Sequence, residues 1–445
     1  MKKTRTLAIG AFAAVAALSL AACSSDGDSG SGDNKTDGAS AQKTIGTVDG
    51  KGKTLTVWAM QGDYSDDVMK AINDKFTAET GAQVKVQSQA WDGIGTKLTT
   101  ALSSSTPPDV IDIGNTQVAG YAATGGLADL TAYKDDLAQG GTWLESLSAP
   151  ATYDSKLYAV PSFVGNRAVI YNKKIWADAG VTEEPTTYAD LKADLDKIKA
   201  KNTASDFSAF YLPGQFWYAG LSWVWDAGGD IATQADGKWT GTFSSAESLK
   251  GLNEFKAFQN AYSTKASATL NTDKPNEDQV MADGKTATMM GAIWDAGAVV
   301  TSSKGKIKAE DLGTFALPGS NGKPAPNFGG GEVWGIAAKS ANQDLALAWT
   351  KIAAGQDVQT MISKVWIPNT TELAATAAAS ADPNSTKGFY DGAGATKSVP
   401  SSPNWATIEG NKVMEGLFSS VASGSKSVED AAKAADDTIN STLNG

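Results

Sequence analysis

Trp294 and Asp295 place an indole ring beside a carboxylate, just after a short apolar run at 287–290 that has the length of a buried strand. An indole can stack on the apolar C–H face of a sugar ring, and a carboxylate can accept hydrogen bonds from sugar hydroxyls. The competing interpretation is an ordinary, partly buried core tryptophan, as most tryptophans are. The pair alone does not decide between the two, so its place in the chain matters.

Polar and aromatic side chains also follow three strands expected near the start of the chain. Apolar patterns predict strands at 54–60, 84–86 and 110–113, separated by two amphipathic helices. The first helix is expected to have Ser65 as its N-cap and Gly81 just after its end. This β-α-β-α-β order predicts a parallel sheet wound with right-handed crossovers.

In parallel sheets of this kind, ligands bind beyond the carboxyl ends of the strands. The residues expected there are Gln61, Gly62, Asp63, Trp91, Asp92, Asn115, Thr116 and Gln117. Amides and carboxylates beside an indole suit a neutral polyhydroxyl ligand better than a phosphate. The glycines at 93–97 lack the spacing of a phosphate-binding loop. These observations favour a sugar at this edge of the sheet.

Two later segments add candidates for the same site. The aromatic segment 216–218 follows turn-forming residues, which favours Trp217 or Tyr218 as side chains that face a cleft. Three consecutive glycines at 329–331 let the backbone approach a ligand or another strand closely. Gly331 and the adjacent Glu332 are therefore candidate ligand-binding residues.

The composition excludes several functional classes. A formal net charge of −11 and a pI near 4.7 leave no basic face for nucleic acid. The chain has no histidine, which excludes His-based nucleophile activation and His-ligated metals. One cysteine excludes internal disulfides and Cys clusters. No cofactor and no metal site is expected, although an oxygen-ligated Ca²⁺ stays compatible with the composition.

The N-terminal segment indicates the compartment. A basic stretch at 2–5 precedes an apolar run at 7–20, which is too short to span a bilayer as a stable helix. The run ends in Leu-Ala-Ala-Cys, which resembles a bacterial lipobox and predicts a signal peptide at 1–22 and a lipid anchor at Cys23. Residues 23–53 are polar and read as a flexible tether. The expected location is the extracellular face of the bacterial cell membrane.

Short motifs follow one another in a characteristic order along nearly the whole chain beyond the tether. They are Trp58, Pro108-Asp109-Val110, Gly120-Tyr121, Gly126-Leu127-Ala128-Asp129-Leu130, Ala159-Val160-Pro161, Tyr171-Asn172-Lys173, Trp225 with Gly228-Gly229, Met281 with Met290-Gly291 and Trp294, and Leu317-Pro318-Gly319. In this order, and together with the lipobox, the chain resembles the extracellular solute-binding proteins of carbohydrate ABC importers. That family includes maltose-binding protein.

The resemblance implies an α/β fold of two lobes joined by crossover segments, with the sugar in the cleft between them. The expected first lobe comprises residues 54–160 and 297–350, and the expected second lobe residues 161–296 and 351–445. The run at 157–160 and the break at Pro161 are expected to lead the chain into the second lobe.

The resemblance also implies roles for individual residues. The family's strongest sugar-stacking tryptophan falls on Trp294, and its other cleft aromatics fall on Trp217 or Tyr218 and on Trp405. Its first-lobe polar contacts fall near Gln61–Asp63, Trp91 and Asn115–Gln117. After the first crossover, maltose-binding protein has an acidic residue where this chain has Gly165-Asn166-Arg167. Asn166 and Arg167 join the candidates, and a maltose-type specificity is not assumed.

Two functions from different classes fit these residues. The first is a monomeric binding protein, with no catalytic residues, that delivers a neutral oligosaccharide to ABC permease subunits. The alternative is an extracellular glycoside hydrolase, which needs two carboxylates about 5–10 Å apart around the scissile bond. Asp295, Glu332 and Asp63 are candidates for that pair by residue type. The expected strand ends offer mostly amides and aromatics, so the binding protein is favoured over the hydrolase. A surface adhesin is a third option, but one deep cleft between lobes does not suit it.

Overall fold

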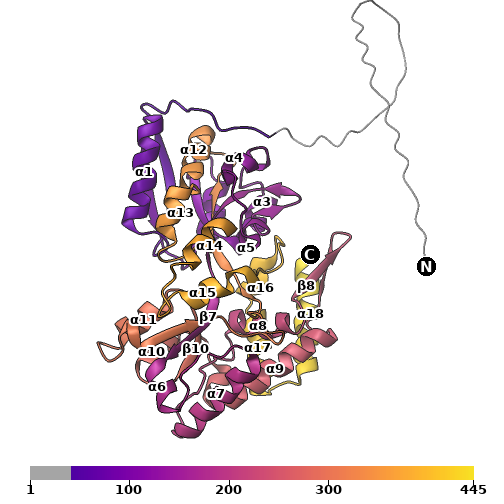
Figure 1. The fold of residues 1–445 in the computed structure, drawn as a ribbon. Helices are drawn as coiled ribbons and strands as arrows, with labels where there is room; N and C mark the ends of the chain where they lie inside the picture. The colour runs from indigo at the N-terminus through magenta and orange to yellow at the C-terminus, as the bar shows by residue number, and fades with distance from the viewer. Residues whose placement is uncertain (1–41) are drawn as a thin grey trace, which may run out of the picture. The chain divides into compact units, whose positions relative to one another are not determined.

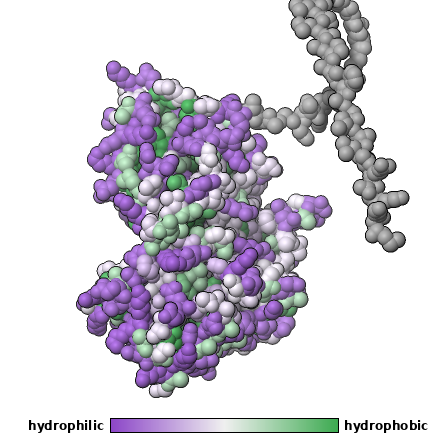
Figure 2. Space-filling model, viewed as in Figure 1, coloured by the Kyte–Doolittle hydropathy of each residue, from purple (hydrophilic) through white to green (hydrophobic). Residues whose placement is uncertain are grey.

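The computed structural model describes residues 42–445. The expected signal peptide at 1–22, the anchor at Cys23 and the tether up to residue 41 lie outside the described residues. Within 42–445 no helix is long and apolar enough to span a membrane. On the face drawn in Figure 2, hydrophilic residues dominate the surface of this part of the chain.

The first lobe is built on a six-stranded mixed sheet. Its strands are ordered β14 (Ile367–Pro368), β6 (Ala159–Gly165), β13 (Gly330–Ile336), β3 (Val110–Gly114), β1 (Thr54–Met60) and β2 (Gln83–Gln89). β1 runs parallel to β2 and β3, as the β-α-β-α-β pattern predicts. β13 pairs antiparallel with both β3 and β6, and β14 pairs antiparallel with β6.

The first helix shows why the local signals were reliable here. Ser65 Oγ accepts the backbone N–H of Val68 at 3.3 Å, and Gly81 ends the helix with φ = 73°. Ile72 and Phe76 bury the apolar face of this helix completely. The helices of this lobe are α1 (Asp66–Thr80), α2 (Ile94–Ser103), α3 (Val118–Ala123), α4 (Lys134–Ala138), α5 (Glu145–Ser148), α12 (Gln343–Ala353), α13 (Gln356–Ile362) and α14 (Thr371–Ala378). Figure 1 shows α1, α12 and α13 side by side.

The second lobe is built around a three-stranded antiparallel sheet, ordered β10 (Thr288–Ala292), β7 (Arg167–Asn172) and β11 (Leu312–Phe315). Alternate residues of β7 lie in two different hydrophobic cores: Ala168 and Ile170 in the core of the first lobe, Val169 and Tyr171 in that of the second. Because both faces are buried, the strand reads as a continuous apolar run.

Helices cover both faces of this sheet. They are α6 (Lys173–Asp178), α7 (Tyr188–Lys201), α8 (Trp217–Asp226), α9 (Ala246–Tyr262), α10 (Glu277–Ala282), α11 (Asp295–Ser302), α15 (Lys387–Gly392), α16 (Trp405–Gly410), α17 (Val413–Ser423) and α18 (Val428–Leu443). Of these, α10, α11 and α15 bury their apolar residues in the first core, and the other helices bury theirs in the second. Figure 1 shows α7, α8, α9 and α17 packed together.

Short elements complete the chain. They are the pairs β4 (Thr152–Tyr153) with β5 (Lys156–Leu157), β8 (Ala232–Ala235) with β9 (Lys238–Gly241) and β12 (Asn327–Phe328) with β15 (Thr396–Lys397), and the 3₁₀ turns η1 (Asn115–Gln117), η2 (Thr131–Tyr133), η3 (Lys265–Thr269), η4 (Ala309–Asp311) and η5 (Ala393–Ala395).

The packing differs from the expected lobe limits in both halves of the chain. The second lobe was expected to start at Pro161, but β6 keeps the chain in the first-lobe sheet up to Gly165. Phe315, expected in the first lobe with 297–350, lies in the second core because β11 pairs with β7. Ile367, expected in the second lobe with 351–445, lies in the first core because β14 pairs with β6. These pairings join strands more than a hundred residues apart, which apolar runs alone do not reveal.

The last part of the expected tether contacts the first lobe. The N–H of Ile45 donates to Asp136 Oδ2 at 2.9 Å, and the N–H of Gly50 donates to the carbonyl of Thr80 at 2.8 Å. Ile45 and Val48 also pack against the first core. Residues 42–53 have no regular secondary structure, yet these contacts fasten them to the lobe, so this part of the expected tether belongs to the first lobe.

Candidate functional site

A cleft of about 580 Å³ is lined by residues of both lobes. The turns after β1, β2 and β3 contribute to it, as expected for the carboxyl ends of parallel strands. The ends of β6 and β13 complete the first-lobe side, and β7, α8 and the start of α11 form much of the other side. The predicted residues that line the cleft are Gln61, Asp63, Trp91, Asn115, Gln117, Arg167, Tyr218, Trp294, Gly331 and Glu332.

Exposed apolar side chains concentrate in this cleft. Among the described residues four large hydrophobic side chains are exposed, and Trp91, Trp294 and Val365 are the three of them that line the cleft. Trp294 is 46% exposed. When a ligand with an apolar face covers a water-exposed indole in a concave site, the burial of apolar surface stabilises the complex.

Trp294 belongs to a row of aromatic rings that fixes its position. It packs edge-to-face on Trp366 with ring centres 5.2 Å apart, and Trp366 stacks on Phe163 at 4.4 Å. Trp366 Nε1 donates to the carbonyl of Asp63 at 2.9 Å. A Cβ on Gly165 would lie 3.2 Å from Trp294 and 3.3 Å from Trp366, so glycine at this crossover lets both indoles approach the backbone.

Arg167 is the cation of the cleft lining. Its guanidinium carbon lies 5.3 Å from the ring centre of Tyr218 and 5.8 Å from that of Trp294, so the group stands between aromatic rings of the second lobe. Its Nε is buried without a hydrogen-bond partner. Burial lowers the pKa of Arg167, and the charge of Asp295 opposes that effect. The group keeps its charge and can donate to a ligand oxygen.

The amides of the first lobe divide between structural and open roles. Asn115 is buried, and its Nδ2 donates to the carbonyls of Ser146 and Gly329 at 3.0 and 3.2 Å. These bonds hold the turn after β3 against α5 and against Gly329, the residue that precedes β13. The Oε1 of Gln117 accepts from the Tyr121 hydroxyl at 3.2 Å, which leaves its Nε2 as a donor toward the cleft.

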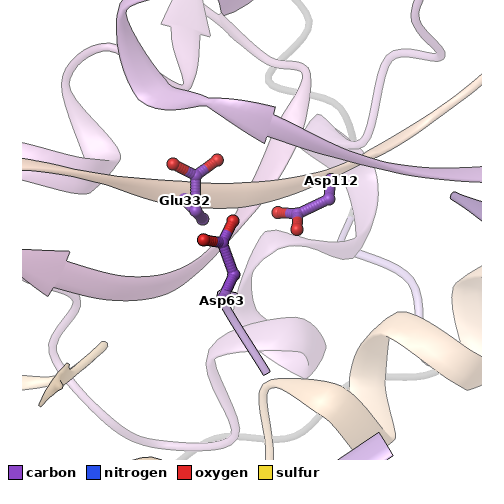
Figure 3. Close-up of side chains that lie close together, drawn as sticks. All are labelled: Asp63, Asp112 and Glu332. Atoms are coloured by element: carbon purple, nitrogen blue, oxygen red, sulfur yellow. The ribbon is translucent and has the colours of Figure 1, made fainter. Parts of the chain in front are cut away.

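Three carboxylates meet at the floor of the cleft. Figure 3 shows the side chains of Asp63, Asp112 and Glu332 pointing toward one another, and each offers an oxygen within 4.8 Å of the other two. Burial raises the pKa of Asp63 to about 7. Burial, and next the neighbouring carboxylates, raise the pKa values of Asp112 and Glu332 well above their usual range.

Four predicted residues do not line the cleft. Trp217 and Trp405 belong to the second core, where Trp405 is fully buried and donates to Glu409 Oε1 at 2.8 Å. Asp295 is buried and accepts the N–H of Ala292 at 2.7 Å, so it orders the start of α11. Asn166 is buried and donates to the carbonyl of Phe389 at 2.8 Å. The two tryptophans therefore serve the packing of the second core, and Asp295 and Asn166 hold backbone groups in place.

The cleft also contains residues that the sequence interpretation missed. They are Phe163, Phe328, Val365, Trp366 and Glu409 in the lining, and Asp112 behind it. Asp112 interrupts the apolar run of β3, and this was the one available signal. Gly331 was expected to let the backbone approach a ligand or another strand. The structure shows the close approach of a strand: a Cβ added at Gly331 would lie 2.1 Å from the Phe163 carbonyl, where β13 passes β6.

The arrangement suits binding better than hydrolysis. A glycoside hydrolase needs carboxylates on both sides of the scissile bond. Asp63, Asp112 and Glu332 instead crowd together on the first lobe, and Asp295 does not reach the cleft. Across the cleft a ligand meets aromatic rings, one guanidinium and a single carboxyl, Glu409, whose Oε1 accepts the Trp405 indole N–H at 2.8 Å.

Solved structures share this fold. The chain superposes with a TM-score of 0.75 on the sugar-binding protein MalE of Xanthomonas citri, at 22% identity and covering 88% of this chain and 98% of that one. The GacH receptor of Streptomyces glaucescens, solved unliganded and with acarbose, gives a TM-score of 0.70 at the same identity and coverage. At these identities the likeness shows the two-lobe periplasmic-binding fold.

Sequence comparisons show the family. Diacetylchitobiose binding protein DasA of Streptomyces coelicolor is 36% identical over 446 aligned residues, which cover 100% of this chain and 99% of that protein. Residues 62–360 match the model of bacterial extracellular solute-binding proteins. These relatives are solute-binding proteins and not enzymes, in agreement with the preferred interpretation of the sequence. The chain belongs to the family of bacterial extracellular solute-binding proteins.

Proposed function

We propose that this protein binds a neutral oligosaccharide in its inter-lobe cleft and delivers it to the permease subunits of an ABC importer. The observation that carries the proposal is the exposure of Trp91 and Trp294 within a cleft that also presents amides, carboxylates and one guanidinium. Rings that stack on sugar faces, next to groups that pair with hydroxyls, match a carbohydrate. The names of DasA and MalE point to the same ligand class.

Binding would close the lobes around the ligand. A sugar that touches both sides of the cleft gains its full contact energy only when the lobes are together, so it shifts the population toward the closed state. The indoles of Trp294 and Trp366 pack against Gly165, at the crossover between the lobes. The stacking of a sugar on Trp294 is therefore coupled to the closure of the lobes. The closed monomer would then present a composite surface to the permease.

Calorimetry on the mature chain with Cys23→Ala, against neutral di- to tetrasaccharides, tests the ligand class. The panel includes glucosides, galactosides, xylosides, fructosides and N-acetylated chitooligosaccharides. We expect one class to bind with a Kd of about 1 μM or tighter and to be recovered unhydrolysed. If no saccharide of the panel binds and a peptide or an amino acid binds instead, the proposal of a sugar ligand is wrong. Release of a hydrolysis product would favour the glycoside hydrolase interpretation.

We also propose that Cys23 is lipid-modified and holds the protein at the extracellular face of the cell membrane. The proposal rests on the lipobox sequence that ends at this cysteine. Cys23→Ala should release the protein into the medium, whereas Ser24→Ala, as a matched control, should leave it in the membrane fraction. Immunoblots of the two fractions measure this. Continued membrane association of the Cys23→Ala protein would contradict the anchor.

A further inference from the structure

Hydrogen bonds within the protein hold only part of the carboxylate cluster of Asp63, Asp112 and Glu332: Asp112 Oδ2 accepts the N–H of Met60 at 3.0 Å, and the side chains of Asp63 and Asp112 lie within hydrogen-bonding reach of each other. Asp112 lies opposite Trp334 in the antiparallel pair of β3 and β13, and Glu332 lies opposite Gly114. Asp112 and Glu332 are therefore diagonal neighbours on one face of the sheet. The turn after β1 brings Asp63 onto the same face, and the three groups converge (Figure 3).

Each of these carboxylates has an oxygen with no hydrogen-bond partner in the described part of the chain. These atoms are Asp63 Oδ2, Asp112 Oδ1 and Glu332 Oε2. Asp112 is 1% exposed and Glu332 is 8% exposed, so water reaches these oxygens poorly. A buried carboxylate oxygen without a partner in the protein is costly, so an ion that contacts all three oxygens would be favourable here.

No basic side chain of the described residues neutralises the cluster. None of the ion pairs formed within 42–445 includes Asp63, Asp112 or Glu332. Arg167, the cation of the cleft lining, stands among aromatic rings of the other lobe and near Asp295. A neutral sugar would supply hydroxyl donors but no positive charge, whereas a cation would stabilise the ionised form of all three groups.

We propose that Asp63, Asp112 and Glu332 form a binding site for a hard divalent cation, Ca²⁺ before others, at the floor of the cleft. The three donors are all carboxylate oxygens, the ligand type that Ca²⁺ prefers, and nitrogen and sulfur donors are missing from the set. Oxygens within 4.8 Å of one another can contact one ion at Ca–O distances of about 2.4 Å. Asp63 and Glu332 face the cleft, whose water can complete the coordination shell.

Titration of the mature Cys23→Ala chain, freed of metal by a chelator, with calcium chloride alone tests the site. We expect one saturable site by calorimetry and a calcium-dependent rise in Tm. Glu332→Gln and Asp112→Asn should each weaken the affinity for calcium at least about 10-fold. Glu409→Gln is the matched control, because Glu409 also lines the cleft but lies outside the cluster. It should bind calcium like the parent chain.

The amide variants report on the site even without calcium. An amide stays neutral at every pH and so avoids the cost of ionisation in a buried cluster; the calcium-free Tm of these variants should therefore equal or exceed that of the parent chain while the calcium-dependent rise is lost. Asp63→Asn, on the least buried member, gives the same readout if another variant does not fold. No heat and no Tm shift with calcium, magnesium or manganese up to about 10 mM would overturn the proposal. Equal calcium binding by all variants would overturn it as well. Because no sugar is present, the result is independent of the proposed sugar binding.

Discussion

The two sides of the cleft carry different chemistry. The first-lobe side presents amides and carboxylates, from Gln61, Asp63, Asn115, Gln117 and Glu332, with the indole of Trp91 among them. The second-lobe side presents rings around one guanidinium, from Arg167, Tyr218, Trp294 and Phe328. Polar groups on the first side follow from strand ends. On the second side Tyr218 and Phe328 extend the aromatic second core into the cleft, whereas Trp294 packs on Trp366.

This difference teaches how the two sides divide the work of binding. Stacking on rings is worth most when the ring is otherwise exposed to water, and it discriminates weakly among sugars. Hydrogen bonds to buried amides and carboxylates discriminate strongly, because a mismatched hydroxyl leaves a buried group without a partner. The second-lobe side should therefore supply most of the affinity, and the first-lobe side most of the selectivity.

The largest effect is expected from removing the central ring of the second-lobe side. Trp294→Ala should weaken oligosaccharide binding by roughly 2–4 kcal/mol, the range of a central anchor residue. Calorimetry with the best sugar of the panel measures this change. Trp239→Ala, on the hairpin of β8 and β9 outside the cleft, is the matched control and should bind normally. A near-normal affinity of Trp294→Ala would show that the rings do not dominate.

The carboxylate of Glu409 is an exception on the ring-bearing side, and its burial predicts a pH effect. Burial raises the pKa of Glu409 to about 7 from an ordinary value near 4.5. The folded state therefore holds this proton more tightly than the unfolded state, and the stability that it contributes is lost as the pH rises from about 4.5 through 7.

Glu409→Gln removes this dependence and keeps an oxygen for the Trp405 indole. The free energy of unfolding of the variant relative to the parent should increase by up to about 3 kcal/mol between pH 4.5 and pH 7.5. Urea unfolding at both values measures it, with the exposed Glu429→Gln as the control for charge removal. A difference between the two chains that does not change with pH would contradict the burial argument.

A smaller effect is expected from changing the shape of the cation but not its charge. Arg167 is the single arginine in the sequence from 42 to 445. Arg167→Lys keeps the charge near Asp295 but loses the planar group between Tyr218 and Trp294, so binding should weaken by about 1 kcal/mol. Calorimetry compares it with Lys192→Arg, a control outside the cleft. An unchanged affinity would mean that Arg167 contributes charge alone.

Local signals account for the parts of the fold that could be predicted. The spacing of Val68, Ile72 and Phe76, with Ser65 and Gly81 as caps, defines α1 without reference to the rest of the chain. Alternating strands and helices then imply the parallel order of β1, β2 and β3. The position of the polar residues after these strands placed most of the first-lobe side of the cleft correctly in space.

Tertiary packing accounts for the parts of the site that could not be predicted from the sequence. Trp217 and Tyr218 are neighbours on α8, yet the helix turns the first ring into the core and the second toward the cleft. Trp405 looked equally suitable, but it is fully buried. Their residue types are nearly equivalent, so the choice depends on how the helix packs.

The sequence by itself determined the class of fold, the edge of the sheet where polar groups gather and the aromatic character of the site, because these follow from local periodicity and strand ends. Only the tertiary structure decided which rings face the cleft, where the lobes divide, and that Asp112 and Glu332 meet. The last pair lies 220 residues apart and is joined by the register of β3 and β13. Register is set by the packing of whole sheets, and no short stretch of sequence contains it.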